Sequence, residues 1–196
     1  MSLRLAILIP TLPERKEKFN SLVAVLKNQV FACGYEWGKD IAMLSDDTAK
    51  GLMTIGEKRN KLMFSESFTA DYGAFIDDDD RIAPYYIKHI MEGIEKGVDA
   101  CSLRGIITSD GQNPELFEHS MRYTEWKTNT TGGIKYFRPN NHLNAIKREI
   151  MQRFPFKEIS HGEDRIWSEA IQVSGLIKTE HYIDEVIYHY DFIPNK

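Results

Sequence analysis

The sequence predicts an α/β fold with a central, mostly parallel mixed sheet flanked by helices, in a single domain that spans residues 1–196. Two observations support it. Short apolar runs alternate with helical patterns through the first half of the chain, which is typical of right-handed βαβ units, and hairpin-like pieces in the second half indicate added antiparallel strands. Because no linker, internal repeat or low-complexity tract divides the sequence, one domain is the simplest interpretation.

The first strand, turn and helix lie at the N-terminal end. Leu3–Ile9 is almost continuously apolar, as expected for a strand covered on both faces. The segment from Thr11 to Glu14 matches a capping box, which predicts that a helix starts there. That helix carries apolar residues at helical spacing: Phe19, Leu22, Val23, Leu26 and Val30.

The pattern then repeats. Ile41–Leu44 and Tyr72–Ile76 predict two further strands, and a possible capping box of Thr54 and Glu57 starts a helix between them. After the second of these strands, Pro84 predicts the start of another helix. Beyond its end at Gly97, strands are expected at Ala100–Leu103, Ile106–Thr108, around Tyr136 and Phe137, and at Ile183–Tyr190, and helices at Lys147–Arg153 and Asp164–Val173.

Composition narrows the possible partners and the compartment. A net charge of -4 gives no general attraction to nucleic acid, so no nucleic-acid partner is expected. The first apolar run stops at Pro10, too short for a transmembrane segment or the core of a signal peptide. Cys33 and Cys101 lack the spacing of a metal site, and two reduced thiols are expected. We therefore expect a soluble, cytoplasmic protein.

Four consecutive aspartates, Asp77, Asp78, Asp79 and Asp80, directly follow the strand at Tyr72–Ile76. Like charges this close repel unless a cation or protons offset them, and ligands of open α/β sheets bind at the carboxyl ends of the strands. Carboxylates suit Mn²⁺ or Mg²⁺, which would complete its coordination with substrate phosphates. A metal site is the favoured interpretation, and a solvated acidic loop is the alternative.

Residues Gly56, Glu57, Lys58, Arg59 and Asn60 open the helix that the capping box predicts. Cations in a first helical turn face the positive end of the helix dipole, and a bound diphosphate would reverse that penalty. Lys58 and Arg59 are therefore candidate phosphate ligands. The alternative is a solvated basic turn.

Further polar residues follow the first two strands, on the rim that also holds the aspartate run. Pro10, Thr11 and Arg15 follow the first strand, and Asp46 and Asp47 follow the second. They are candidates for contact with the nucleotide. Thr11 equally fits a helix N-cap, and the two aspartates equally fit a plain turn.

Two candidates for chemistry lie near the C-terminal end. Glu163 and Asp164 start a helix and fit a general base with a neighbouring orienting group, or simple complements of the helix dipole. His189, between Tyr188 and Tyr190, is a candidate third metal ligand, although a packed or hydrogen-bonded histidine is the more usual case.

Taken together, these segments resemble the inverting GT-A glycosyltransferases, particularly the large family-2 group and its short viral and bacterial members. The resemblance spans nearly the whole chain, and its most specific part runs from Ile55 to Pro84. It implies that Ile9–Arg15 lies beside the nucleotide base and that Asp46 or Asp47 holds the base or ribose. The DxD element of the family resembles Asp77, Asp78 and Asp79, with Asp79 on the metal and Asp78 or Asp77 facing the ribose.

The resemblance also implies the chemistry. The segment Gly162–Asp164 is similar to the family's ED motif, whose aspartate is the catalytic base, and His189 is similar to a late histidine that some members place on the metal. The implied activity is inverting, metal-dependent transfer from a nucleotide sugar, with a UDP-sugar favoured, to the hydroxyl of a glycan or another acceptor. The alternatives are a non-catalytic nucleotide-sugar-binding protein and a sugar-phosphate nucleotidyltransferase, which typically has a glycine-rich loop where this chain has Pro10 to Arg15.

Overall fold

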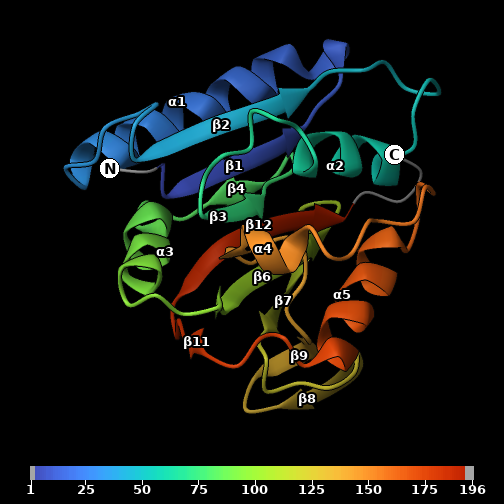
Figure 1. The fold of residues 1–196 in the computed structure, drawn as a ribbon. Helices are drawn as coiled ribbons and strands as arrows, with labels where there is room; N and C mark the ends of the chain where they lie inside the picture. Colours follow the sequence, from blue (N-terminus) through green and yellow to red (C-terminus); the bar gives the residue numbers. More distant parts are fainter. Residues whose placement is uncertain (1–2, 193–196) are drawn as a thin grey trace.

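The computed structural model describes residues 3–192, which form two mixed six-stranded sheets with helices packed around them (Figure 1). The first sheet has the strand order β11-β5-β10-β3-β1-β2. Its parallel part consists of β1 (Leu5–Pro10), β2 (Ile41–Asp46) and β3 (Tyr72–Phe75), with Leu5 of β1 opposite both Ile41 and Tyr72. Every residue of β1 is buried, as its continuous apolar run predicts.

Three short strands extend this sheet beyond β3. They are β10 (Ile146–Lys147), which runs antiparallel to β3 and to β5, then β5 (Ala100–Cys101) and β11 (Glu180–His181). The sheet is therefore mixed, in agreement with the predicted fold class. No prediction covered β11, which is only two residues long.

Helices cover both faces of the first sheet. Leu5, Ile7 and Ile9 of β1 pack with the apolar residues of α1 (Lys16–Ala32) and α3 (Tyr86–Glu95). Ala6 and Leu8 point to the opposite face, where they pack with α2 (Ile55–Met63), α4 (Arg148–Met151) and α5 (Glu163–Ser174). The alternation of side chains along one buried strand thus divides the core into two layers.

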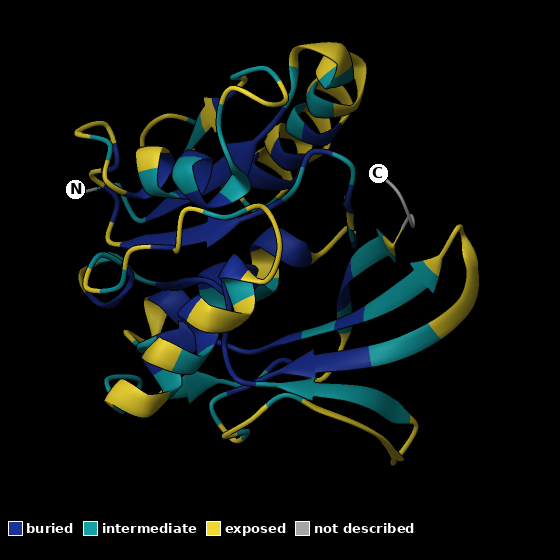
Figure 2. Cartoon of the chain, turned by 90° about the vertical axis from the view of Figure 1, so that its right-hand side faces the viewer, coloured by how far each residue is buried: buried dark blue, intermediate teal, exposed yellow. Residues whose placement is uncertain are grey.

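The second sheet has the strand order β4-β12-β6-β7-β9-β8. Its strands are β4 (Arg81–Ile82), β12 (Val186–Phe192), β6 (Leu103–Ser109), β7 (Gln112–His119), β9 (Ile134–Arg138) and β8 (Lys127–Thr131). Figure 2 shows that this sheet is buried where it meets the rest of the molecule and exposed toward its outer turns. Strand β8 is exposed throughout and has no apolar residue, so no hydrophobic pattern in the sequence predicted it.

The capping box predicted at Thr54 is confirmed. The Glu57 amide donates to the Thr54 hydroxyl oxygen at 3.2 Å, and the Thr54 amide donates to the Glu57 carboxylate at 2.7 Å. The capping box predicted at Thr11 is wrong. A 3₁₀ turn, Pro13–Arg15, follows Leu12 without a side-chain cap, and the Thr11 hydroxyl donates to Asp78 instead, because a buried carboxylate lies within its reach.

The strand predicted at Ala100–Leu103 is divided between the two sheets. The chain leaves the first sheet after Cys101 and enters the second at Leu103. Ser102 holds this crossing, because its amide donates to the His181 carbonyl at 2.9 Å and its hydroxyl accepts from the Ile183 amide at 2.7 Å. Both cysteines are free thiols, and burial raises the pKa of Cys101 to about 12.

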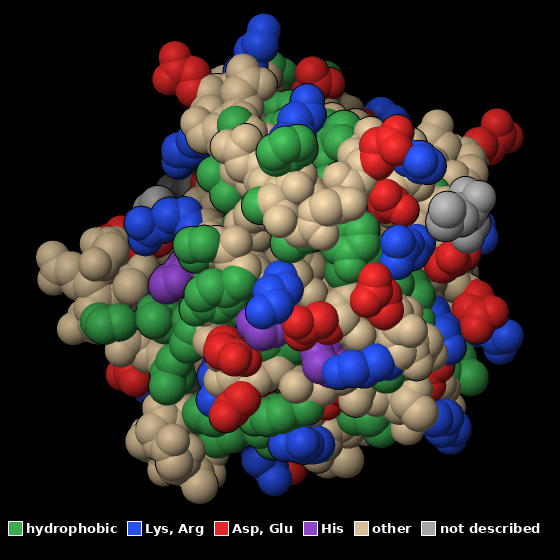
Figure 3. Space-filling view, turned by 90° about the vertical axis from the view of Figure 1, so that its left-hand side faces the viewer, with side chains coloured by type: hydrophobic (Ala, Val, Ile, Leu, Met, Phe, Trp, Pro, Cys, Tyr) green, Lys and Arg blue, Asp and Glu red, His purple; other side chains and the backbone are tan. Residues whose placement is uncertain are grey.

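The surface over α3 carries charged side chains of both signs, together with histidines (Figure 3). His89 Nδ1 lies 3.3 Å from Glu92, and Lys96 Nζ lies 3.1 Å from His181 Nδ1. The second of these contacts connects the C-terminal end of α3 to β11. Among residues 3–192, no helix combines the length and the apolar character that crossing a lipid bilayer requires.

Candidate active site

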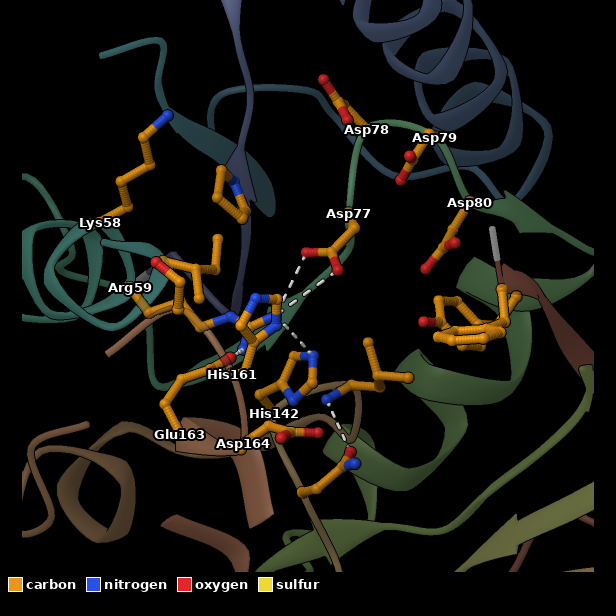
Figure 4. Close-up of a pocket in the computed structure, with 18 of the residues that line it drawn as sticks. Lys58, Arg59, Asp77, Asp78, Asp79, Asp80, His142, His161, Glu163 and Asp164 are labelled. Carbon is orange, nitrogen blue, oxygen red and sulfur yellow. Dashed lines mark hydrogen bonds and ion pairs between the residues drawn. The ribbon is translucent and has the colours of Figure 1, made fainter. Parts of the chain in front are cut away.

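A cavity of about 640 Å³ opens at the carboxyl ends of β1 and β3, between the first sheet, the second sheet and the start of α5 (Figure 4). Strand ends on this rim are where open α/β sheets bind ligands. Most of the predicted site residues line it: Pro10, Thr11, Arg15, Lys58, Arg59, Asp77, Asp78, Asp79, Glu163 and Asp164. Tertiary structure therefore gathers segments more than 150 residues apart into one site.

The four aspartates have different partners. Asp78 is fixed through both carboxylate oxygens, which accept from the Thr11 hydroxyl at 2.7 Å and from Arg15 Nη1 at 2.9 Å. Asp79 pairs with the same Arg15 nitrogen at 3.1 Å. Arg15, in the turn after β1, thus supplies a positive charge that offsets the repulsion between these aspartates.

Asp77 and Asp80 diverge from this pair. Asp77 keeps 29 % of its side chain exposed and turns toward Arg59, with 3.4 Å between its Oδ1 and Arg59 Nη2 (Figure 4). Asp80 accepts from the Tyr188 hydroxyl at 2.7 Å, within the boundary between the sheets. Burial, reinforced by the charge of Asp77, raises the pKa of Asp80 well above its ordinary value. Asp80 is therefore the least suited of the four to hold a cation.

Arg59 is a buried link between the aspartate run and α5. Its guanidinium pairs with the Glu163 carboxylate and with Asp77, and its Nη2 lies 3.0 Å from His142 Nε2. Phe75 flanks it, with the ring centre 5.9 Å from the guanidinium carbon. Burial alone would lower the pKa of Arg59, but the charges of Asp77 and Glu163 outweigh it and raise the pKa. The protein's own carboxylates thus engage one of the two predicted phosphate ligands.

Lys58, the other predicted phosphate ligand, lies at the opposite side of the α2 start. Its ammonium donates to the Thr11 carbonyl at 2.6 Å, and burial lowers its pKa. The pairing is with a neutral oxygen, so the positive charge of Lys58 remains available to an anion in the cavity.

Gly56 and Asn60, predicted to bind the donor, instead hold the segment that precedes α5. The Gly56 amide donates to the Ile159 carbonyl at 3.1 Å, and a Cβ added at Gly56 would overlap the Lys157 carbonyl oxygen. The Asn60 side chain donates to the Phe156 carbonyl at 2.9 Å and accepts from the Phe156 amide at 2.7 Å. Neither residue is part of the cavity lining, and both position the approach to Glu163 and Asp164.

Asp46, Asp47 and His189 also lie outside the lining that the structure defines within residues 3–192. Asp46 pairs with Lys61 and accepts from the Thr48 amide at 3.0 Å. Burial alone would raise the pKa of Asp46, but these two partners outweigh it and lower the pKa. His189 follows Tyr188 in β12, and the alternation of strand side chains directs it away from the face that Tyr188 shares with Asp80. Burial, with Arg81 nearby, lowers its pKa. The structure does not bring His189 to the aspartates.

Glu163 and Asp164 open α5 directly after Gly162, whose φ of 79° is the left-handed conformation that favours glycine. Burial raises the pKa of Glu163, and the Arg59 charge opposes that rise. Asp164 lines the cavity together with Glu163 at the start of α5 (Figure 4). Glu163 thus anchors the helix start to Arg59, and its neighbour is presented to the cavity.

Several residues of the cavity lining were not among those predicted from the sequence. Arg138 lies with its guanidinium carbon 4.2 Å from the centre of the Trp126 ring. His119 and His142 are buried, and burial lowers the pKa of both well below the ordinary value. His142 Nε2 must accept from Arg59, because arginine only donates. His119 and Arg138 are the last residues of β7 and β9, and Trp126 and His142 lie in loops. No local pattern relates these positions to the aspartate run, so only the fold reveals them.

The donor set is compatible with a divalent cation that has few protein ligands. Among residues 3–192, no three His, Cys, Asp or Glu side chains form a group able to hold a metal. Asp77 and Asp79 nevertheless offer hard carboxylate oxygens on the cavity wall. Mg²⁺ characteristically uses one or two carboxylates together with substrate phosphates and water, which matches a pair better than a complete cage.

Comparison with known proteins identifies the fold. Neither a protein-family model nor a curated protein sequence matches the chain. Among solved structures, S. aureus TarS 1-349 matches with a TM-score of 0.61 and 14 % identity over 96 % of this chain and 60 % of that one. The same fragment in complex with UDP-GlcNAc matches with a TM-score of 0.62 and 14 % identity, over 99 % of this chain and 60 % of that one.

The TarS fragment in complex with UDP matches similarly, with a TM-score of 0.61 and 14 % identity, over 98 % of this chain and 61 % of that one. The chain has a glycosyltransferase fold. It spans about three fifths of the length of these TarS fragments. At 14 % identity the likeness defines the arrangement of the sheets and helices, and the chemistry must be argued from the cavity itself.

Proposed function

We propose that the protein transfers a sugar from a nucleotide-diphosphate sugar, with UDP-sugars favoured, to an acceptor hydroxyl, with inversion and with a divalent metal. One observation carries the proposal: a single cavity contains Asp77 and Asp79 at a strand end and Asp164 at a helix start. The structural neighbour solved in complex with UDP-GlcNAc supports a donor of this class. Such an arrangement would supply both a diphosphate site and a separate general base.

Asp164 is the proposed general base. It would remove the proton from the acceptor hydroxyl as the oxygen attacks the anomeric carbon on the face opposite the nucleotide. Glu163, held by the buried Arg59, fixes the helix start and hence the position of its neighbour. A base held in place by a rigid helix start avoids the loss of rate that misplacement of a catalytic group causes.

The opposite part of the cavity is the proposed donor site. Pro10 and Thr11 would lie beside the nucleotide, and Lys58 would contact the diphosphate, whose negative charge grows as it departs. Asp79, with Asp77, would hold Mn²⁺ or Mg²⁺, which when bound supplies positive charge to the leaving group.

A thermal-shift panel of nucleotide sugars tests the donor site. One donor should raise the unfolding temperature when Mn²⁺ is present, since a ligand that binds only the folded state stabilises it. At a free concentration of a hundred times its Kd, the gain is about 2.7 kcal/mol. Asp79→Asn should lose the part of this temperature shift that depends on Mn²⁺. A shift that is the same in both proteins would remove Asp79 from metal binding.

Substitution of the base tests the chemistry. Asp164→Asn keeps the shape of the side chain but cannot accept the proton, so transfer should fall by at least about a hundredfold while donor affinity is unchanged. Glu169→Gln, at an exposed position of the same helix, is the matched control and should retain normal transfer. Near-normal transfer by Asp164→Asn would exclude Asp164 as the base.

Product analysis separates the alternative functions. With pyrophosphate supplied, a nucleotidyltransferase would convert the nucleotide sugar into a sugar 1-phosphate and a nucleoside triphosphate, whereas a glycosyltransferase releases the nucleoside diphosphate. Binding of a nucleotide sugar without transfer or hydrolysis of any donor in the presence of Mn²⁺ would indicate a non-catalytic binding protein.

A further inference from the structure

The Arg15 guanidinium pairs with two buried carboxylates at once. Arg15 ends the turn that follows β1, and its Nη1 lies 2.9 Å from Asp78 Oδ1 and 3.1 Å from Asp79 Oδ2. The side chains of Asp78 and Asp79 are 1 % and 8 % exposed, whereas that of Arg15 is 25 % exposed. A single cation thus offsets two adjacent charges that have little contact with solvent.

The two ion pairs differ in what supports them. Asp78 also accepts from the Thr11 hydroxyl, and Thr11 is fixed by its amide, which donates to the Asp46 carbonyl at 2.8 Å, and by Lys58 on its carbonyl. Asp78 is therefore held by a partner other than Arg15. Asp79 is the proposed metal ligand, and its pair with Arg15 uses the carboxylate that the metal would need.

A divalent cation on Asp79 and the Arg15 guanidinium would be neighbouring positive charges, which repel strongly where solvent is scarce. Binding of the metal must therefore compete with the ion pair. Arg15 lines the same cavity and is partly exposed, so its guanidinium can turn without crossing the core. The anion that enters this cavity under the proposed function is a diphosphate, to which arginine can donate two parallel hydrogen bonds.

We propose that Arg15 is an internal counter-ion that competes with the divalent metal for Asp79 and transfers to the donor's diphosphate when metal and donor bind together. This inference rests on the proposed function of the cavity. Its consequence is that the metal alone binds weakly, and that metal and nucleoside diphosphate strengthen each other's binding by the same factor.

Calorimetric titration of Mn²⁺ alone tests the competition. Arg15→Gln removes the charge and should bind Mn²⁺ about fivefold more tightly than the wild type, or better, while Arg15→Lys keeps the charge and should stay within about twofold. Arg81→Gln is the matched control. Arg81 adjoins the aspartate run at an exposed position, where its charge acts on His189 and Asp191. This change removes a nearby positive charge other than that of Arg15, and Mn²⁺ affinity should also stay within about twofold.

Titration of UDP tests the second part. With Mn²⁺ saturating, Arg15→Gln should bind UDP about fivefold less tightly than the wild type, and the factor by which Mn²⁺ and UDP strengthen each other should shrink. Tighter Mn²⁺ binding together with weaker UDP binding is a pattern that a merely structural role of Arg15 does not produce, because a disturbed site would weaken both.

In the Mn²⁺ titration, the proposal would be overturned by binding to folded Arg15→Gln that is no tighter than in the wild type, or by an equal gain in Arg81→Gln. If Arg15→Gln fails to fold, Arg15→Met gives the same comparison with a neutral side chain of similar length. The outcome is distinct from that of the proposed function. Sugar transfer that persists in EDTA would support the glycosyltransferase activity and contradict the proposed role of Arg15. If no sugar is transferred but Arg15→Gln still binds Mn²⁺ more tightly than the wild type, the role of Arg15 is supported and the proposed activity is contradicted.

Discussion

Arg59 is the residue on which the geometry of the site depends most directly. Its buried guanidinium pairs with Glu163 and Asp77, which stand on different elements. Removing one partner of a buried ion pair leaves an uncompensated charge, so Arg59→Leu should lower the free energy of unfolding by about 3–5 kcal/mol in urea titrations. Arg165→Leu, which breaks an exposed pair on α5, should change it by no more than about 1 kcal/mol. Equal effects of the two changes would contradict the buried link.

Asp80 predicts a dependence of stability on pH. Burial and the charge of Asp77 raise its pKa in the folded protein, so the folded state holds the proton more tightly than the unfolded chain. The stability that Asp80 contributes is complete below the ordinary aspartate pKa of about 3.9 and is lost as the pH rises through the folded-state pKa. Asp80→Asn stays neutral. In EDTA, the unfolding free energy of Asp80→Asn relative to that of the wild type should therefore rise as the pH increases above the ordinary aspartate pKa.

The control for that measurement is Asp110→Asn, at an exposed turn whose φ of 51° asparagine also tolerates. The difference in unfolding free energy between Asp110→Asn and the wild type should not change with pH in the way expected for Asp80→Asn. If the unfolding free energies of Asp80→Asn and the wild type differ by the same amount at every pH, the pKa of Asp80 is not raised in the folded protein.

At the scale of elements, α2 supports the approach to α5 through Gly56. Any Cβ at this position meets the Lys157 carbonyl oxygen, so Gly56→Ala should displace the segment that leads to Asp164. We expect a loss of transfer by at least about tenfold, since small misplacement of catalytic groups is costly, together with lower thermal stability. Gly97→Ala is the control. It introduces strain of about 1 kcal/mol at a φ of 70°, in open space after α3, and should leave transfer unchanged.

On the scale of the whole molecule, partly buried polar contacts join β11 of the first sheet to the segments that follow β7 and β9 of the second. Glu180 of β11 accepts from the Ser120 hydroxyl at 2.6 Å, the Met121 amide at 2.8 Å and Asn140 Nδ2 at 3.1 Å. Glu180→Ala leaves these donors without their acceptor, so the free energy of unfolding should fall by about 2–4 kcal/mol. Glu185→Ala, at an exposed position, should stay within about 0.5 kcal/mol. If Glu180→Ala and Glu185→Ala unfold at the same urea concentration, the contacts of Glu180 do not hold the two sheets together.

The parallel half of the first sheet was predictable because its strands are buried on both faces and therefore read as continuous apolar runs. The aspartate run and the start of α5 were recognisable for a related reason, since charged residues at the ends of such elements are costly unless they bind or pair. The second sheet was only partly predictable. Strands such as β8 lie at the surface and are held by backbone hydrogen bonds. Nearly any side chain is compatible with such bonds, so these strands leave little pattern in the sequence.

The sequence by itself determined the fold class, the order of the parallel strands along the chain and the acidic residues at their ends, because burial and charge leave local patterns. Only the tertiary structure decided which of those residues meet. It directs Arg59 to Glu163, makes Gly56 and Asn60 supports for the α5 approach, turns His189 away from the aspartates, and places Arg15 between Asp78 and Asp79. Such pairings depend on the directions of side chains from distant segments, which no local pattern encodes.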